Sequence, residues 1–338
     1  MIGTLQQEEI EVEDSLKVQE LFYQNEWTDG LPVVPPTKEK IETMLETVPM
    51  DPQTIVGSIP ERGCTFTLEV AAINAVMAGC LPEYFPVVVT VLSAISDTAF
   101  GLHGPSASTH GPAILIIVNG PVAKSIGLNH GQNLFGPGVR SNSTIGRAVR
   151  LILMNAGGTR EFDRSTLGHG GKYSYCIAEN ETTAWQPLHV QKGFSSEIST
   201  VTVFAGEAPN QFQNHTAQKA ESILLTLADR MTALGTFNIN GHSEMAVILC
   251  PEHYQTCHSQ GWNKKSIQEF LQQHAFRTRA ELIRGGIIEE EIKTEDETKV
   301  IKVKYQGYTP VNNYWKLFKD NRRTSHCGYF GKKWLGFR

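Results

Sequence analysis

The sequence lacks the short motifs that mark the commonest cofactor and nucleophile sites. It contains no GxxxxGK[ST] phosphate loop, no GxGxxG dinucleotide fingerprint, no GxSxG nucleophile elbow and no HExxH metal motif. Its six cysteines are scattered without a CxxC pair, so neither a zinc ribbon nor a thioredoxin-like site is indicated. Because no nicotinamide or flavin fingerprint is present, a lyase, hydratase or hydrolase is favoured over a hydride-transfer enzyme.

The chain also has little net charge and no long apolar run. Its formal charge of -5 over 338 residues gives no support for nucleic-acid binding. No apolar stretch reaches the length of a membrane span, and the polar, acidic start does not resemble a signal peptide. We therefore expect a cytoplasmic protein with reduced cysteines, and no nucleic-acid or membrane partner.

The stretch with the most distinctive composition is 135–158, in which a glycine-rich loop leads into a predicted helix. Ser143 or Thr144 is the expected N-cap. Arg140 and Asn142 precede the helix in this reading, and Arg147 lies inside it. A helix N-terminus carries unpaired N–H groups and partial positive charge, and arginine forks bind carboxylates and phosphates. This pattern predicts a binding site for an anionic substrate. The alternative is a surface helix whose arginines are solvated.

Two apolar runs predict buried strands in an α/β or mixed α+β fold, with helices on the faces of a mixed sheet. They are 113–119 (AILIIVN) and 245–250 (MAVILC), and each is followed by a proline that suits a helix start. Ligands bind at the carboxyl ends of such strands. We interpret the repetition as two related βα halves, and we add Asn119 and the buried-helix residue Asn74 to the candidate substrate contacts.

Four residues are candidates for catalysis. Glu252 and His253 follow the second predicted strand at a helix N-terminus, where a neutral histidine suits a general base. Cys80 and Glu83 occupy a predicted corner between two apolar helices, where a thiol or an acid could react. The alternatives are a packing role for His253 and an inert, buried Cys80.

The sequence permits a divalent metal ion as a cofactor, and no motif demands it. His169 lies in a glycine-rich loop, and Cys176 and Glu179 follow it closely along the chain. These side chains are suitable ligands for zinc or a similar ion.

The predicted organisation has an acidic lead-in and one large body. The segments are an acidic lead-in at 1–26, a catalytic α/β body at 27–285, a surface β-hairpin at 286–305 and a basic, aromatic tail at 306–338. The body could divide into halves at about 27–160 and 161–285. A tail of this kind suits docking on its own domain or on a neighbouring subunit, and a homo-oligomer is expected.

Several segments together resemble a family of poorly characterised microbial proteins, loosely associated with UGSC-type selenocysteine- or cysteine-containing proteins. They are WTDGLPVVPPT (27–37), AINAVMAGCLPEYFP (72–86), NGP (119–121), RSNSTIGRAVRLILMNAGG (140–158) and CPEHYQTCHSQGW (250–262). The resemblance spans about 27–285 and implies no particular reaction, and this chain has no Cys-Gly-Ser-Cys motif.

The residues therefore favour a small-molecule enzyme that acts on an anionic substrate by acid–base chemistry, with or without a metal ion. Two alternatives remain at this stage. One is a thiol-dependent oxidoreductase that uses Cys80 or Cys176, and the other is a non-catalytic subunit of a larger complex.

Overall fold

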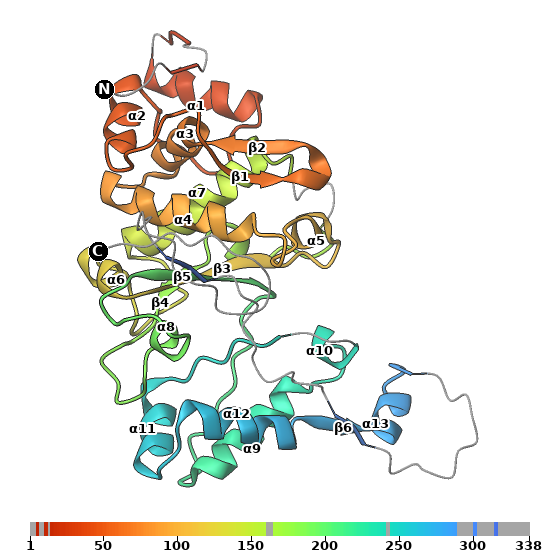
Figure 1. Cartoon of the computed structure of the whole chain (residues 1–338). Helices are drawn as coiled ribbons and strands as arrows, with labels where there is room; N and C mark the ends of the chain where they lie inside the picture. Colours follow the sequence, from red (N-terminus) through yellow and green to blue (C-terminus); the bar gives the residue numbers. More distant parts are fainter. Residues whose placement is uncertain are drawn as a thin grey trace. The chain divides into compact units, whose positions relative to one another are not determined.

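The computed structural model describes residues 5–6, 10–12, 14–159, 165–240, 244–288, 300–302 and 314–316. The chain has a mixed α/β architecture and divides into two compact units (Figure 1). The first unit is Met1–Pro209 with Asn312–Arg338, and the second is Asn210–Val311.

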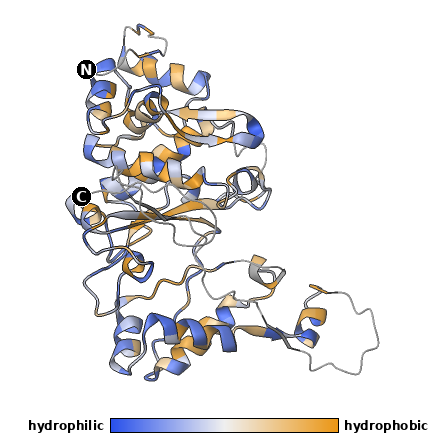
Figure 2. Ribbon diagram, viewed as in Figure 1, coloured by the Kyte–Doolittle hydropathy of each residue, from blue (hydrophilic) through white to orange (hydrophobic). Residues whose placement is uncertain are grey.

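The first unit begins with helices and a β-hairpin. Thr67 accepts a hydrogen bond from the Val70 backbone N–H at the start of α3 (Leu68–Ala78), and Gly79 ends this helix with φ +88°. Hydrophobic residues dominate the following helix α4 (Phe85–Ile95), as Figure 2 shows. The other elements of this region are α1 (Ser15–Gln24), α2 (Lys38–Leu45), η2 (Pro82–Tyr84), α5 (His103–Ala107) and the antiparallel strands β1 (Ile55–Ile59) and β2 (Cys64–Thr67), joined by η1 (Pro60–Arg62).

A four-stranded mixed sheet with the order β4-β3-β5-β8 lies at the centre of this unit. The strand predicted at 113–119 is confirmed as β3 (Ala113–Asn119). It pairs in parallel with β4 (Cys176–Ala178) and antiparallel with β5 (Thr200–Gly206). The short strand β8 (Tyr314–Lys316) pairs antiparallel with the other edge of β5.

The two faces of the sheet carry different side chains, because successive residues of a strand point to opposite sides. Ile116 and Val118 of β3 join the main hydrophobic core, in which α4 and α7 (Arg140–Asn155) contact the sheet. Ala113 and Leu115 lie on the other face in a small separate cluster with Tyr175 and Ile177. Figure 1 shows α8 (Leu188–Gln191) on the side of the sheet opposite α4. The remaining elements of the unit are α6 (Pro121–Ser125) and η4 (Gly170–Lys172).

Helix α7 begins earlier than the sequence predicts. Its N-cap is Val139, and no side chain caps it. The predicted caps are wrong, because Ser143 already donates its backbone N–H to the Val139 carbonyl and Thr144 donates its hydroxyl to the Arg140 carbonyl. Arg140 is therefore the first residue of the helix.

The second unit is mainly helical. Helix α9 (Ala220–Met231) packs against α11 (Pro251–Ser259) and α12 (Lys264–His274), and Asn263 and Ser266 form a reciprocal capping box at the start of α12. Its other elements are α10 (Phe237–Asn240), β6 (Phe276–Thr278), α13 (Arg279–Arg284) and β7 (Val300–Lys302).

Three predictions about organisation need correction. The strand predicted at 245–250 is absent: this segment is extended without a sheet partner among the described residues, and Val247 and Ile248 are 37% and 42% exposed. The predicted repetition of two βα halves is therefore wrong, because the second half depended on this strand. The division falls after Pro209, because β4 and β5 complete the sheet that β3 begins.

The predicted hairpin at 286–305 falls largely outside the described residues. Within it the structure describes 286–288 and β7, and β7 pairs antiparallel with β6, which lies before the predicted hairpin. Apart from β8, the predicted tail at 306–338 also lies outside the described residues. Within the described part of the chain, no helix is both long and apolar enough to cross a membrane.

Candidate active site

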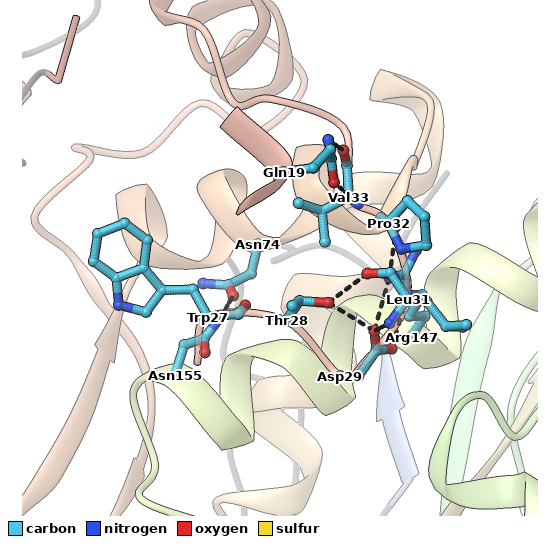
Figure 3. Close-up of polar contacts among 10 residues, drawn as sticks. All are labelled: Gln19, Trp27, Thr28, Asp29, Leu31, Pro32, Val33, Asn74, Arg147 and Asn155. Atoms are coloured by element: carbon cyan, nitrogen blue, oxygen red, sulfur yellow. Dashed lines mark hydrogen bonds and ion pairs between the residues drawn. The ribbon is translucent and has the colours of Figure 1, made fainter. Parts of the chain in front are cut away.

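Arg147, predicted to bind substrate, is bound instead to the segment 27–33. Its Nε and Nη2 donate to the two carboxylate oxygens of Asp29, both at 2.8 Å, and Nη2 also donates to the Pro32 carbonyl at 2.9 Å (Figure 3). The side chains of Arg147 and Asp29 are only 15% and 5% exposed. Asp29 also accepts from the Leu31 backbone N–H, two residues further on, as aspartates in turns commonly do.

Asn74 belongs to the same network. Its Oδ1 accepts from Asn155 of α7 at 2.7 Å, and Asn155 also donates to the Trp27 carbonyl at 3.0 Å. From α1, Gln19 bonds both the N–H and the carbonyl of Val33. Side chains of α1, α3 and α7 therefore form one network that holds the segment 27–33 in place. The polar groups of this network stabilise the fold.

Asn142 and Arg140 have different environments. Asn142 is 5% exposed, and its amide accepts from the Asn129 N–H at 2.8 Å and donates to the Cys176 carbonyl at 2.9 Å, so it joins a loop to β4. Arg140 is exposed, and its Nε donates a hydrogen bond to the Gly79 carbonyl oxygen at 3.0 Å. Of the three predicted anion contacts, Arg140 is the one whose guanidinium reaches an open surface.

The two candidates at the corner between α3 and α4, Cys80 and Glu83, have different environments. Cys80 is buried, donates to the Thr144 carbonyl at 3.3 Å, and has its pKa raised to about 12 because burial penalises the thiolate. Glu83 lies exposed in η2. Cys64, Cys80, Cys176, Cys250 and Cys257 are free, and Cys327 is outside the described residues.

The predicted metal ligands are not brought together. Cys176 faces the main core, and burial raises its thiol pKa. His169 contacts the ring of Tyr175, which belongs to the cluster on the other face of the sheet. Glu179 lies beyond the end of β4. Across the residues that the structure describes, no group of three or more His, Cys, Asp or Glu side chains has an arrangement that could hold a metal ion.

Glu252 and His253 lie in the second unit at the start of α11. Glu252 is exposed, and its pKa is lowered mainly by a hydrogen bond to a backbone N–H in the first helical turn. His253 is 6% exposed, stacks on Phe212 at a centroid distance of 5.4 Å and has Nε2 3.2 Å from the Asn214 carbonyl oxygen. The buried strand that motivated their catalytic assignment is absent.

The structure instead gathers polar side chains at the carboxyl ends of β3 and β4. Asn119, the last residue of β3, donates its amide N–H groups to Glu179 at 2.6 Å and to Glu181 at 2.8 Å. Backbone groups hold the same carboxylates: Gly120 donates to Glu181 at 2.7 Å, and Leu188 donates to Glu179 at 2.7 Å. Two carboxylates therefore converge on one buried amide.

His189 of α8 completes this carboxyl-edge cluster, which we define as Asn119, Glu179, Glu181 and His189. Its Nδ1 lies 3.7 Å from Glu181 Oε1, and its side chain is 1% exposed while that of Glu181 is 29% exposed. Glu181 therefore lies between solvent and a buried imidazole.

Several buried polar atoms around the cluster have no hydrogen-bond partner among the described residues. They are Asn119 Oδ1, both ring nitrogens of His189, and the hydroxyls of Thr200 and Thr202. Thr200 lies directly opposite Asn119 in the antiparallel pair, so their side chains share one face of the sheet. An unsatisfied buried polar group costs about 1–3 kcal/mol, and such groups in native proteins call for a functional or solvent explanation.

Gly120 allows the end of β3 to lie close to the residues that precede β5. Gly120 has φ +87°, and a Cβ built there would lie 2.5 Å from the Ile198 carbonyl oxygen. Ser199, the next residue, accepts from the Val122 N–H at 2.9 Å in the first turn of α6. The backbone thus fixes both Asn119 and the N–H of Gly120 that orients Glu181.

Sequence analysis found two members of the cluster and missed the other two. Asn119 and Glu179 were named separately, as a substrate contact and as a metal ligand. Glu181 could have been found from its position just after β4, because parallel strands bring their carboxyl ends to one edge. No comparable signal identified His189, which lies in a short helix without a recognisable motif.

Comparison with known proteins adds no assignment. No family model matches the chain, and neither the curated proteins nor the solved structures contain a match. The resemblance to UGSC-type proteins accordingly stays a prediction.

Proposed function

We propose that this chain is a small-molecule enzyme of the lyase, hydratase or hydrolase type, working by acid–base chemistry at the carboxyl-edge cluster. The observation that carries the proposal is the pairing of a buried, unbonded imidazole with an oriented carboxylate, His189 Nδ1 and Glu181 Oε1 at 3.7 Å. Histidine and glutamate are common general acids and bases, which transfer a proton to or from a substrate.

The exposures of the two side chains suggest their roles. Glu181 is the partly exposed member, so its carboxylate would exchange a proton with the substrate. His189 lies behind it and would stabilise the carboxylate or pass the proton on. Asn119 and the Gly120 N–H fix Glu181 Oε1 and leave Oε2 for the substrate.

Glu179 makes the surroundings of this pair acidic. Its carboxylate shares the Asn119 amide with Glu181, so a second negative charge is close to the reacting group. Like charges repel, so the part of the substrate that reacts at Glu181 would be neutral or cationic. An anionic substrate, as the sequence predicts, would need a cation for its charged end, and no lysine or arginine belongs to the cluster.

A reaction screen with isosteric variants tests the proposal. Purified protein is incubated in D2O with a panel of hydroxy acids, esters, lactones and amides, and product formation or C–H exchange is followed by proton NMR. Glu181→Gln and His189→Asn should each lower any turnover by about a hundred- to ten-thousandfold, the usual contribution of a general acid or base.

Glu197→Gln is the matched control, because Glu197 is an exposed acid of the same unit outside the cluster. Its turnover should equal that of the unmodified chain. Melting temperatures of all variants are compared, so that a loss of fold is not taken for a loss of chemistry. Full turnover in folded Glu181→Gln would remove the cluster as the active site.

A further inference from the structure

A pocket separate from the carboxyl-edge cluster opens where α2, the end of α3 and the start of α7 meet. Its volume is about 320 Å³. This lies near the lower end of the range for small-molecule sites, roughly 300–1,000 Å³. None of its lining residues belongs to the cluster, so the inference below goes beyond the proposed function and does not depend on it.

Arg140 supplies a fixed cation at this pocket. Its Nε donates to the Gly79 carbonyl at 3.0 Å, which holds the plane of the guanidinium against the end of α3. No hydrogen bond from its two terminal nitrogens to the described residues is found. A guanidinium held in this way can donate two parallel hydrogen bonds to a carboxylate.

The other charged groups of the lining leave the pocket net positive. Lys40 contributes a second cation, with Nζ 3.3 Å from the Pro35 carbonyl oxygen. Glu39 is the one anion of the lining, but its carboxylate is engaged at the start of α2, where hydrogen bonds from its own backbone N–H and from Thr37 lower its pKa. The Cys80 thiol is neutral at physiological pH, since burial raises its pKa to about 12.

Apart from Thr43 and Gly79, the rest of the wall is apolar. Val34, Met44, Val76 and Pro82 line the pocket beside the charged groups. A ligand that fits this lining carries one anionic group and an apolar body, whereas a fully polar anion would leave the apolar wall in contact with water.

We propose that this pocket binds a small monocarboxylate with an aliphatic body, its carboxylate on Arg140 and Lys40 and its chain against Val34, Met44, Val76 and Pro82. Hexanoate is a suitable probe. Hexanol and inorganic phosphate test separately the contributions of the apolar body and of the negative charge. Hexanol keeps the apolar body without the charge, and phosphate keeps the charge without the body.

Isothermal titration of the full-length protein measures the binding. Hexanoate should bind more tightly than hexanol or phosphate, and Arg140→Gln should weaken it by about ten- to a hundredfold, the value of a charge-assisted contact. Thr43→Trp, which fills the pocket from its exposed rim, should also weaken binding. Lys38→Gln is the control, because Lys38 is an exposed lysine of α2 that does not line the pocket.

The outcomes separate this inference from the proposed function. Glu181→Gln should bind hexanoate as the unmodified chain does, even if its turnover is lost. Hexanoate binding unchanged in folded Arg140→Gln, or no hexanoate binding in the unmodified chain, would overturn the proposal. Tight binding of phosphate with no binding of hexanoate would also overturn it, because the apolar wall would then have no role.

Discussion

Arg147 of α7 donates two hydrogen bonds of 2.8 Å to the carboxylate of Asp29, a residue 118 positions earlier in the chain. The pair is largely shielded from solvent and is supported by the Pro32 carbonyl. A charge removed from such a pair leaves its partner buried and uncompensated. The sequence predicts that Arg147 binds an anionic substrate. In the structure its guanidinium instead binds a carboxylate of the protein itself.

Replacing Arg147 with leucine should destabilise the fold by about 3–5 kcal/mol, as expected for one member of a buried ion pair. Urea unfolding followed by circular dichroism measures the change. Arg140→Leu is the matched control and should cost far less, because Arg140 is exposed. Equal stability losses in the two variants would contradict this prediction.

Replacing Gly120 with alanine should disrupt the carboxyl-edge cluster. The added Cβ would lie 2.5 Å from the Ile198 carbonyl oxygen at φ +87°, so backbone strain and overpacking combine to about 2–5 kcal/mol. Gly127→Ala is the control, because Gly127 also has positive φ but nothing lies within 4 Å of its added Cβ. Thermal unfolding should show a clearly larger loss for Gly120→Ala; similar losses would mean that the close approach is not needed.

Stability should fall at alkaline pH through the buried thiol of Cys80. Its pKa is raised to about 12 in the folded state from an ordinary value of 9.0, so the folded state holds its proton more tightly than the unfolded state. The thiol's contribution is complete below pH 9 and is lost as the pH rises toward 12, by about 1.4 kcal/mol per pH unit. Denaturant unfolding at a series of pH values should show a shallower decline for Cys80→Ala, whereas the exposed Cys250→Ser should follow the unmodified chain.

His253 should contribute to the stability of the second unit. It is buried and stacked on Phe212, so His253→Ala should remove packing from this unit. Proteolysis and unfolding monitored by mass spectrometry should show earlier cleavage within 210–288. A folded variant with greatly reduced turnover and unchanged protection would restore the catalytic role predicted for this residue.

Local sequence signals were sufficient for many elements of this fold. The apolar, β-branched run at 113–119 forms β3, and Thr67 and Gly79 bound α3 as their capping chemistry requires. The same reasoning failed at 245–250, where an equally apolar run pairs with no strand in the described part of the chain. A strand depends on backbone partners distant in sequence, and periodicity does not report whether they exist.

By itself, the sequence determined the mixed α/β class and the buried strand β3, because these depend on local propensity and on the pattern of apolar residues. Only the tertiary structure decided which polar residues bond other parts of the fold and which converge in the carboxyl-edge cluster. It paired Arg147 with Asp29 across 118 positions and brought Glu181 and His189 to Asn119. Such partnerships depend on distances in space, because hydrogen bonds and charge pairs act over a few ångströms whatever the separation along the chain.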